Sequence, residues 1–281
     1  MNRPIELLVF DNDGVCGSSE KPKAAGWAVG VMWATGRMPA ADLGRLRAGE
    51  AAFARQIYDT LHELYPREVA YIRSLSGMSR ADTCVAVQQA LVTPVTGSDD
   101  STALYEGREA AKDVLLTEFT EPIAGTHKLL AAVRGKLKLA LATQTDRPTV
   151  ELLAGRGVIP LDVFDAVVAV GGDPRFAGIA GSKDKKRAAY MAACAELGVL
   201  PGRACCVEDS VDGLGAAGSA GLLRLGFQAP DNPQDLVPHA DLVLADLAPL
   251  ADPSLIELVA TMPAGEAVRL LRERLAVYVV G

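Results

Sequence analysis

The stretch IELLVFDNDGV, residues 5–15, carries the signal that decides the fold of this chain. Residues 5–10 form a short, largely apolar run, which is typical of a buried parallel strand. Asp11 and Asp13 follow at once, and Gly14 permits a sharp turn directly after them. A surface Asp-Gly turn is one interpretation of these residues. However, the two charges end a buried strand, and a charge in that position needs a partner such as a metal ion.

Further apolar runs of strand length follow, and helical patterns separate them. The predicted strands cover residues 137–142, 166–170, 204–207, 222–225 and 242–244, and the predicted helices cover residues 147–156, 185–197 and 213–220. Strands and helices that alternate at this spacing predict an α/β fold with a doubly wound parallel sheet.

The region between the first two predicted strands is different, because its apolar residues recur at helical spacing and no strand pattern is present. We therefore expect an all-helical cap domain at residues 18–118, inserted into a core domain formed by residues 1–17 and 119–250. Residues 251–281 are predicted to be a C-terminal helical extension. Its amphipathic helix at about 263–280 can pack on the core or form the contact of a homodimer.

Composition and charge narrow the function classes. The chain has 281 residues and a formal net charge of −7, which argues against a nucleic-acid partner, since such a partner favours a basic face. We expect no membrane association, because no apolar run approaches the length of a transmembrane helix or of a secretory signal. Five cysteines without metal-ligand spacing, among them adjacent Cys205 and Cys206 on opposite faces of a strand, fit reduced thiols in the cytoplasm.

Polar residues also follow two later strands. Ligands of such sheets gather beyond the carboxyl ends of the strands, so these residues are candidates for a binding site. The hydroxyl of Thr143 and the free amides around Gln144 suit a phosphate oxygen, although Thr143 or Thr145 can equally be a helix cap. Glu208 and Asp209 follow residues 204–207 and resemble a magnesium site, because this hard cation prefers carboxylate oxygens.

A cationic stretch, GSKDKKR at residues 181–187, opens the predicted helix 185–197. One inward lysine there can balance a carboxylate and a phosphate, while the other charges form a solvated helix start. We expect this lysine to be Lys183, the first after the glycine-containing loop 171–181 and the one before the helix begins. Lys185 and Lys186 remain alternatives, and Lys186 lies four residues before Tyr190.

Taken together and in this order, the four motifs resemble the haloacid dehalogenase superfamily. The motif FDNDGV at residues 10–15, with Ser19 and Glu20, and the motif VEDSVDG at residues 207–213 are similar to its helical-cap branch, which contains phosphoglycolate phosphatases and β-phosphoglucomutases. The resemblance covers residues 5–20 and 119–250, and the helical insertion lies where that branch places its cap. It implies a Rossmann-like core and a phosphoric monoester hydrolase that needs Mg²⁺.

The resemblance also implies a role for each motif residue. Asp11 is the expected nucleophile that forms an aspartyl-phosphate, and Asp13 is the expected general acid and base. The expected magnesium ligands are Asp11, Asp13 through its backbone carbonyl, and Asp209, with Glu208 nearby. The expected phosphate-binding residues are Thr143, Gln144 and Lys183.

The expected substrate class on this basis is a small phosphorylated metabolite. A phosphosugar mutase uses the same acids and is the alternative within enzymes. The alternative that is not an enzyme is a catalytically idle phosphate-binding module. Such a module would be expected to lack Asp11 or Asp13, and both are present. We expect substrate specificity to lie in the cap, where six arginines are available (Arg37, Arg45, Arg47, Arg55, Arg73 and Arg80).

Overall fold

The computed structural model describes residues 3–75, 78, 80–229, 232 and 234–280. The chain divides into two compact units. Unit 1 contains Met1–Ser18 and Pro122–Gly281, and unit 2 is Ser19–Glu121. The chain passes between them next to the two-residue strands β2 (Gly17–Ser18) and β3 (Glu121–Pro122). The predicted cap boundaries, 18 and 118, lie close to these crossings, and the predicted extension 251–281 belongs to unit 1.

Unit 1 is built on a six-stranded parallel sheet with the order β5-β4-β1-β6-β7-β8. Its strands are β1 (Leu7–Phe10), β4 (Lys138–Asp146), β5 (Ala166–Gly171), β6 (Ala204–Glu208), β7 (Leu223–Phe227) and β8 (Leu242–Leu244). Its helices are α8 (Ala124–Val133), α9 (Arg147–Gly155), α10 (Ser182–Glu196), α11 (Val211–Ala220), α12 (Pro253–Thr261) and α13 (Ala264–Arg274). The predicted α/β fold class is therefore confirmed.

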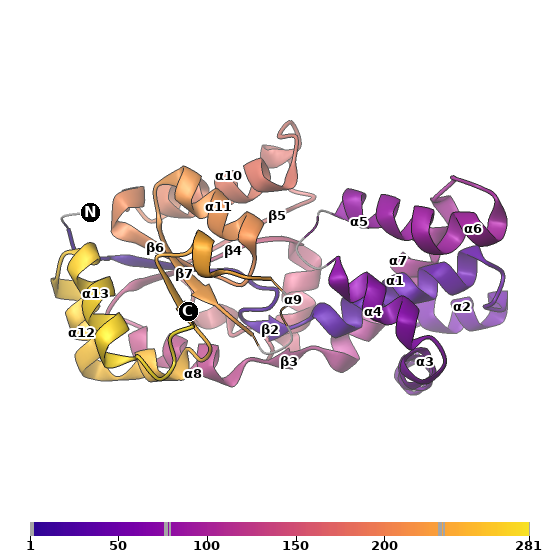
Figure 1. Cartoon of the computed structure of the whole chain (residues 1–281), viewed down its shortest axis with the longest axis horizontal. Coiled ribbons are helices and arrows are strands. Elements are labelled where there is room, and N and C mark those ends of the chain that lie inside the picture. Colours follow the sequence, from indigo (N-terminus) through magenta and orange to yellow (C-terminus); the bar gives the residue numbers. More distant parts are fainter. Residues whose placement is uncertain (1–2, 76–77, 79, 230–231, 233, 281) are drawn as a thin grey trace. The chain divides into compact units, whose positions relative to one another are not determined.

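Helices cover both faces of this sheet because side chains alternate along each strand. Leu7 and Val9 of β1 belong to the core cluster that also contains residues of α10 and α11. Leu8, between them, lines a cavity on the opposite face, where α8, α12 and α13 pack. Figure 1 shows these two helix groups on opposite sides of the strands. The buried strands thus carry apolar residues on both faces, as the sequence predicted.

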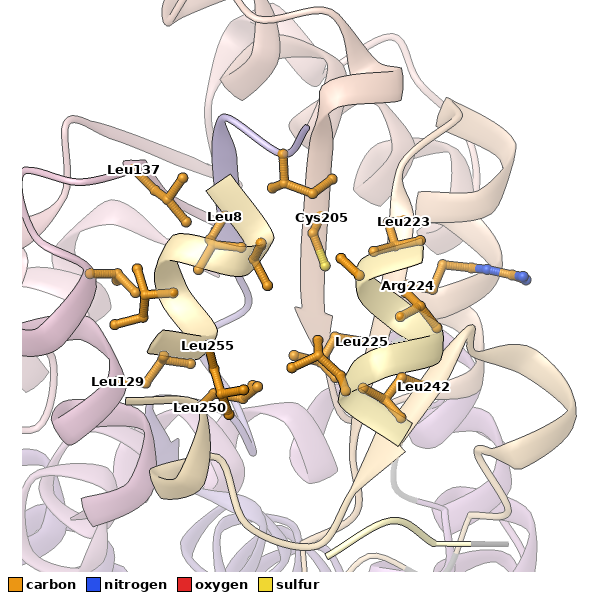
Figure 2. Close-up of a pocket in the computed structure, with 17 residues that line it drawn as sticks. Leu8, Leu129, Leu137, Cys205, Leu223, Arg224, Leu225, Leu242, Leu250 and Leu255 are labelled. Carbon is orange, nitrogen blue, oxygen red and sulfur yellow. The ribbon is translucent and has the colours of Figure 1, made fainter. Parts of the chain in front are cut away.

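The opposite face retains an apolar cavity of about 60 Å³. Cys205 lines it, whereas its neighbour Cys206 lies in the core cluster on the other face, as predicted for adjacent strand residues. In Figure 2 the leucines around the cavity surround a common space, while the guanidinium of Arg224 turns away from it. That guanidinium pairs with Asp241 at 2.8 Å. Because its charge lies outside the cavity, the cavity wall is apolar.

The C-terminal residues complete unit 1. Ala267 and Leu271 of α13 are buried and line the cavity, so the amphipathic helix packs on the sheet rather than standing apart. The following residues bond to β8, since Val280 N–H donates to the Val243 carbonyl at 3.1 Å. All five cysteines of the chain are free and buried. A homodimer stays a prediction.

Apart from Glu121 of β3, the regular secondary structure in the described residues of unit 2 is helical, in agreement with the predicted insertion. Its helices are α1 (Glu20–Ala34), α2 (Ala40–Arg47), α3 (Ala51–Leu64), α4 (Pro66–Ser74), α5 (Arg80–Val87), a π-helical turn (Gln88–Val92), α6 (Thr93–Thr96) and α7 (Thr102–Phe119). Four of the six arginines considered for specificity, Arg37, Arg45, Arg47 and Arg55, form ion pairs with glutamates within the unit. A seventh, Arg108, is buried with its guanidinium 4.8 Å from the ring centre of Trp27, and the sequence analysis missed it.

Candidate active site

The strand order brings three of the sequence motifs to one edge of the sheet. β1 lies between β4 and β6, and all three strands are parallel. Their carboxyl ends, which carry Asp11–Asp13, Thr143–Thr145 and Glu208–Asp209, therefore emerge side by side. This is the edge at which ligands of open α/β sheets bind.

Asp11 is the first residue beyond β1, and it is buried with 7% of its surface exposed. Its N–H donates to the Val207 carbonyl at 3.0 Å, which ties it to β6. Its Oδ1 lies 2.5 Å from Nζ of Lys186 but accepts no well-aligned hydrogen bond from the described residues. Burial raises the pKa of Asp11 to about 7, the charge of Lys186 opposes the rise, and Glu208 and Asp13 add to it. A carboxylate in this state is stabilised by a further cation.

The inward lysine is Lys186, so the prediction of Lys183 was wrong. α10 begins at Ser182, three residues before the predicted start, and Lys183 is therefore already part of the helix. Lys183 is exposed, and its Nζ lies against Gly215 of α11. Lys186 is buried one helical turn before Tyr190, so both side chains reach the same carboxylate, Glu208.

Lys186 is held as a cation by two acids. Its Nζ lies 2.5 Å from Asp11 Oδ1 and 2.8 Å from Glu208 Oε1. Burial alone would lower the pKa of Lys186, but the charges of Asp11 and Glu208 outweigh it and raise this pKa above the usual range. The ammonium is thus a fixed positive charge beside Asp11.

Glu208 is fully buried and organises its surroundings. Its Oε1 accepts a hydrogen bond from the Tyr190 hydroxyl at 2.9 Å, in addition to the ion pair with Lys186. Its Oε2 accepts from the backbone N–H of Asp209 and from the N–H and hydroxyl of Ser210, at 2.9–3.1 Å. Although burial opposes it, Lys186 and these donors hold the pKa of Glu208 below its usual range. Because both oxygens are fully used, Glu208 anchors Lys186 and the strand end and has no lone pair left for a direct metal bond.

The carboxylates of Asp11, Glu208 and Asp209 form a cluster whose ligand atoms lie within 4.8 Å of one another. Gly14 makes this approach possible, because it has a positive φ of 74° and any Cβ there would clash with the Asp209 carboxylate. On the other side, Asn232 Nδ2 donates to the Asp209 carbonyl, a contact that the sequence analysis missed. The buried carboxylate of Asp11 and a second carboxylate beside it are the oxygen donors that fit a divalent cation.

Asp13 and the end of β4 complete the site. Asp13 Oδ2 accepts a hydrogen bond from the Thr145 hydroxyl at 2.7 Å. Thr143 is fully buried, and its Oγ1 accepts from the N–H of Thr145 at 3.1 Å. Gln144 is exposed and bonds to Ser182, with 2.8 Å between Nε2 and Oγ. Neither threonine caps α9, because that role belongs to Asp146.

A model of the haloacid dehalogenase-like hydrolases matches residues 5–221. The chain belongs to this family. The predicted family is therefore confirmed, and so is the expectation of a hydrolase. The family match ends before β7, so α12 and α13 lie outside it.

Individual relatives agree with this assignment. Protein CbbY of Cereibacter sphaeroides is 28% identical over 225 residues, which cover 78% of this chain and 82% of the relative. The crystal structure of a CbbY variant from Rhodobacter sphaeroides with xylulose-(1,5)-bisphosphate has a TM-score of 0.60 at 22% identity and covers 88% of this chain and 96% of that one. A structure described as a predicted phosphoglycolate phosphatase from Haemophilus somnus has a TM-score of 0.62 at 14% identity, covering 89% and 98%. The two structures show that the chain shares their fold.

Proposed function

We propose that this protein is a magnesium-dependent phosphatase that hydrolyses a small phosphorylated metabolite through an aspartyl-phosphate. The observation that carries the proposal is the placement of Asp11. It is buried at the carboxyl end of the central strand, 2.5 Å from the ammonium of Lys186 and next to the carboxylate of Asp209. Asp13 follows it on the same loop, where a second acid is needed.

The proposed reaction has two steps, formation of the aspartyl-phosphate and its hydrolysis. A carboxylate oxygen of Asp11 attacks phosphorus in line, and the bond between phosphorus and the leaving oxygen breaks while Asp13 gives that oxygen a proton. Water then attacks the aspartyl-phosphate and gives a proton to Asp13, which releases inorganic phosphate and restores Asp11. The second acid favours phosphate esters over carbon–halogen bonds, because a halide leaves without a proton.

Other residues of the site hold the phosphoryl group in this proposal. Lys186, not Lys183, would balance its negative charge, because Lys186 is the ammonium beside Asp11. The buried Thr143 hydroxyl would bind a phosphoryl oxygen at the neighbouring strand end. Gln144 is exposed and bonds to Ser182, so it would contribute to phosphate binding from the solvent-facing edge of the site.

Asp11 and Asp209 would hold Mg²⁺ together with the backbone carbonyl of Asp13, while Glu208 would keep its structural bonds. When bound, the ion neutralises negative charge on the transferring phosphoryl group.

The relatives support the substrate class. The CbbY variant was crystallised with a sugar bisphosphate, which is a small phosphorylated metabolite. No helix of the described residues has the length and hydrophobicity needed to cross a bilayer. A cytoplasmic location follows from the sequence alone and stays a prediction.

The test is a screen of purified protein against a panel of phosphomonoesters in the presence of Mg²⁺, with released inorganic phosphate as the readout. The Asp11→Asn variant is the control, because its amide is a poor nucleophile. We expect at least one ester to be hydrolysed by the wild type and turnover to be abolished in the variant. Turnover of the folded variant within about tenfold of the wild type would refute the mechanism.

A further inference from the structure

The end of β4 departs from regular strand geometry. The pairing with β5 shifts between Thr143, which faces Ala169, and Asp146, which faces Gly171. Three steps along β4 therefore match two along β5, which is the signature of a β-bulge. Such bulges redirect side chains, and here the residues between the two paired positions are Gln144 and Thr145.

Two further features hold this bulge in place. The Thr143 hydroxyl oxygen accepts the N–H of Thr145 at 3.1 Å, which gives a backbone group displaced from the ladder a partner. Gly171 leaves room on β5, because a Cβ there would lie 2.6 Å from the Gln144 carbonyl oxygen and 2.7 Å from the Asp146 nitrogen. A side chain at position 171 would push the bulge away, so the position of Thr145 is built into both strands.

The bulge directs the Thr145 hydroxyl to one atom. It donates to Asp13 Oδ2 at 2.7 Å, while Asn12 Nδ2 donates to the other oxygen, Oδ1, at 3.2 Å. Thr145 is half-buried, which shields this hydrogen bond from competing water. Both oxygens of Asp13 are thus engaged, and the rotation of its carboxyl group is restricted.

We propose that Thr145 is the positioning residue of Asp13, holding the carboxyl group of the acid and base in the orientation needed for proton transfer. The inference rests on the proposed function, because it assigns Asp13 the proton transfers described above. Thr145 itself exchanges no proton with the substrate. Because its hydroxyl already restricts the Asp13 carboxyl group, Asp13 loses less conformational entropy when it reaches the transition state.

Leaving-group dependence separates this role from a merely structural one. The phenolate that leaves phenyl phosphate needs a proton on its oxygen, whereas 2,4-dinitrophenyl phosphate releases 2,4-dinitrophenolate, a stable anion that needs none. The ratio kcat/KM reports the steps up to formation of the aspartyl-phosphate, where the two esters differ. The kcat value also includes the hydrolysis of that intermediate, in which Asp13 serves both esters as the base.

We expect Thr145→Val to lower kcat/KM for phenyl phosphate by about tenfold or more, the range for losing a hydrogen bond to a charged group. For 2,4-dinitrophenyl phosphate, kcat/KM should stay within about twofold of the wild type while kcat and KM fall together. Thr145→Ser keeps the hydroxyl and should restore both values, and Thr145→Ala should behave like Thr145→Val. Thr261→Val, which removes an exposed hydroxyl on α12 that bonds to the Glu257 carbonyl, is the matched control and should change neither ester.

Three outcomes overturn the inference. Equal losses of kcat/KM for both esters would indicate a general disturbance of the site, and unchanged values for phenyl phosphate would show that Thr145 is dispensable. A Thr145→Ser variant as impaired as Thr145→Val would exclude the hydroxyl as the cause. If instead the wild type hydrolyses neither these esters nor any member of the metabolite panel, the proposed function itself fails, and this inference fails with it. Thermal unfolding of each variant verifies that the protein is folded.

Discussion

Replacing Lys186 tests the electrostatic arrangement of the site most directly. Its side chain is 4% exposed, and its ammonium lies 2.5 Å from Asp11 Oδ1 and 2.8 Å from Glu208 Oε1. Lys186→Met keeps much of the side-chain volume but leaves these two buried carboxylates without their shared cation. Removing one partner of a buried ion pair costs about 3–5 kcal/mol of folding stability. We expect a loss in this range in metal-free protein.

Activity should fall as well, because the same ammonium would balance the phosphoryl group in the transition state. We expect kcat/KM for phosphate release to drop by about a hundredfold or more, equivalent to about 2.7 kcal/mol of barrier. Urea unfolding without metal measures the first effect, and phosphate release with Mg²⁺ measures the second. Lys183→Ala and Lys185→Ala are matched controls on the same helix, and both should stay within about 0.5 kcal/mol of wild-type stability, as surface substitutions do.

This reasoning would be refuted if the effects of replacing Lys183 and Lys186 were reversed. If Lys183→Ala loses a hundredfold in kcat/KM while Lys186→Met remains near normal, the ammonium that serves the reaction is not the one beside Asp11. Wild-type stability of Lys186→Met in metal-free protein would equally show that the buried carboxylates do not depend on this cation.

Further predictions concern the metal, the reaction and the core. Exhaustive chelation should abolish phosphate release, and full activity after chelation would exclude the metal role. Mg²⁺ at a hundred times its Kd should raise the free energy of unfolding of the wild type by about 2.7 kcal/mol, and it should raise that of Asp209→Asn much less. A phosphatase should release inorganic phosphate from its substrate, whereas conversion of β-glucose 1-phosphate to the 6-phosphate without phosphate release, followed by NMR, would identify a mutase instead. Filling the cavity of about 60 Å³ with Ala267→Val should raise stability by about 1 kcal/mol, since cavities cost about 24 cal/mol per Å³. Ala193→Val in the packed core cluster of the opposite face should lower stability by about 1–3 kcal/mol, and equal effects of the two valines in urea unfolding would contradict this difference in packing.

Local sequence signals located the elements of the core well. The first strand, the cap insertion and the alternation of strands and helices were all predicted, because apolar periodicity reflects which residues each element buries. The closely spaced acids after two of these strands also identified candidate site residues, since charges at the end of a buried strand require a partner. What these signals share is that each depends on neighbouring residues only.

The start of α10 shows where local signals were insufficient. The charged residues 183–187 give no apolar period, and the sequence pattern therefore favours the first lysine after the loop as the inward one. The helix begins earlier, at Ser182, and each residue then rotates about 100° from the last. The spacing of four between Lys186 and Tyr190 was visible in the sequence, but only the position of Glu208 shows that both side chains converge on one carboxylate.

The sequence by itself determined the strands, the helices and the acids, because each follows from the chemistry of adjacent residues. Only the tertiary structure decided that β1 lies between β4 and β6, and that the acids, Thr143 and Lys186 therefore meet at one edge. Only the tertiary structure also shows that a bulge directs Thr145 to Asp13 and that the carboxylate oxygens of Glu208 make five contacts, one ion pair and four hydrogen bonds. The physical reason is that strand order and side-chain direction depend on packing between separate elements of the chain, as between Asp13 and Thr145, which are 132 positions apart, and no local pattern encodes it.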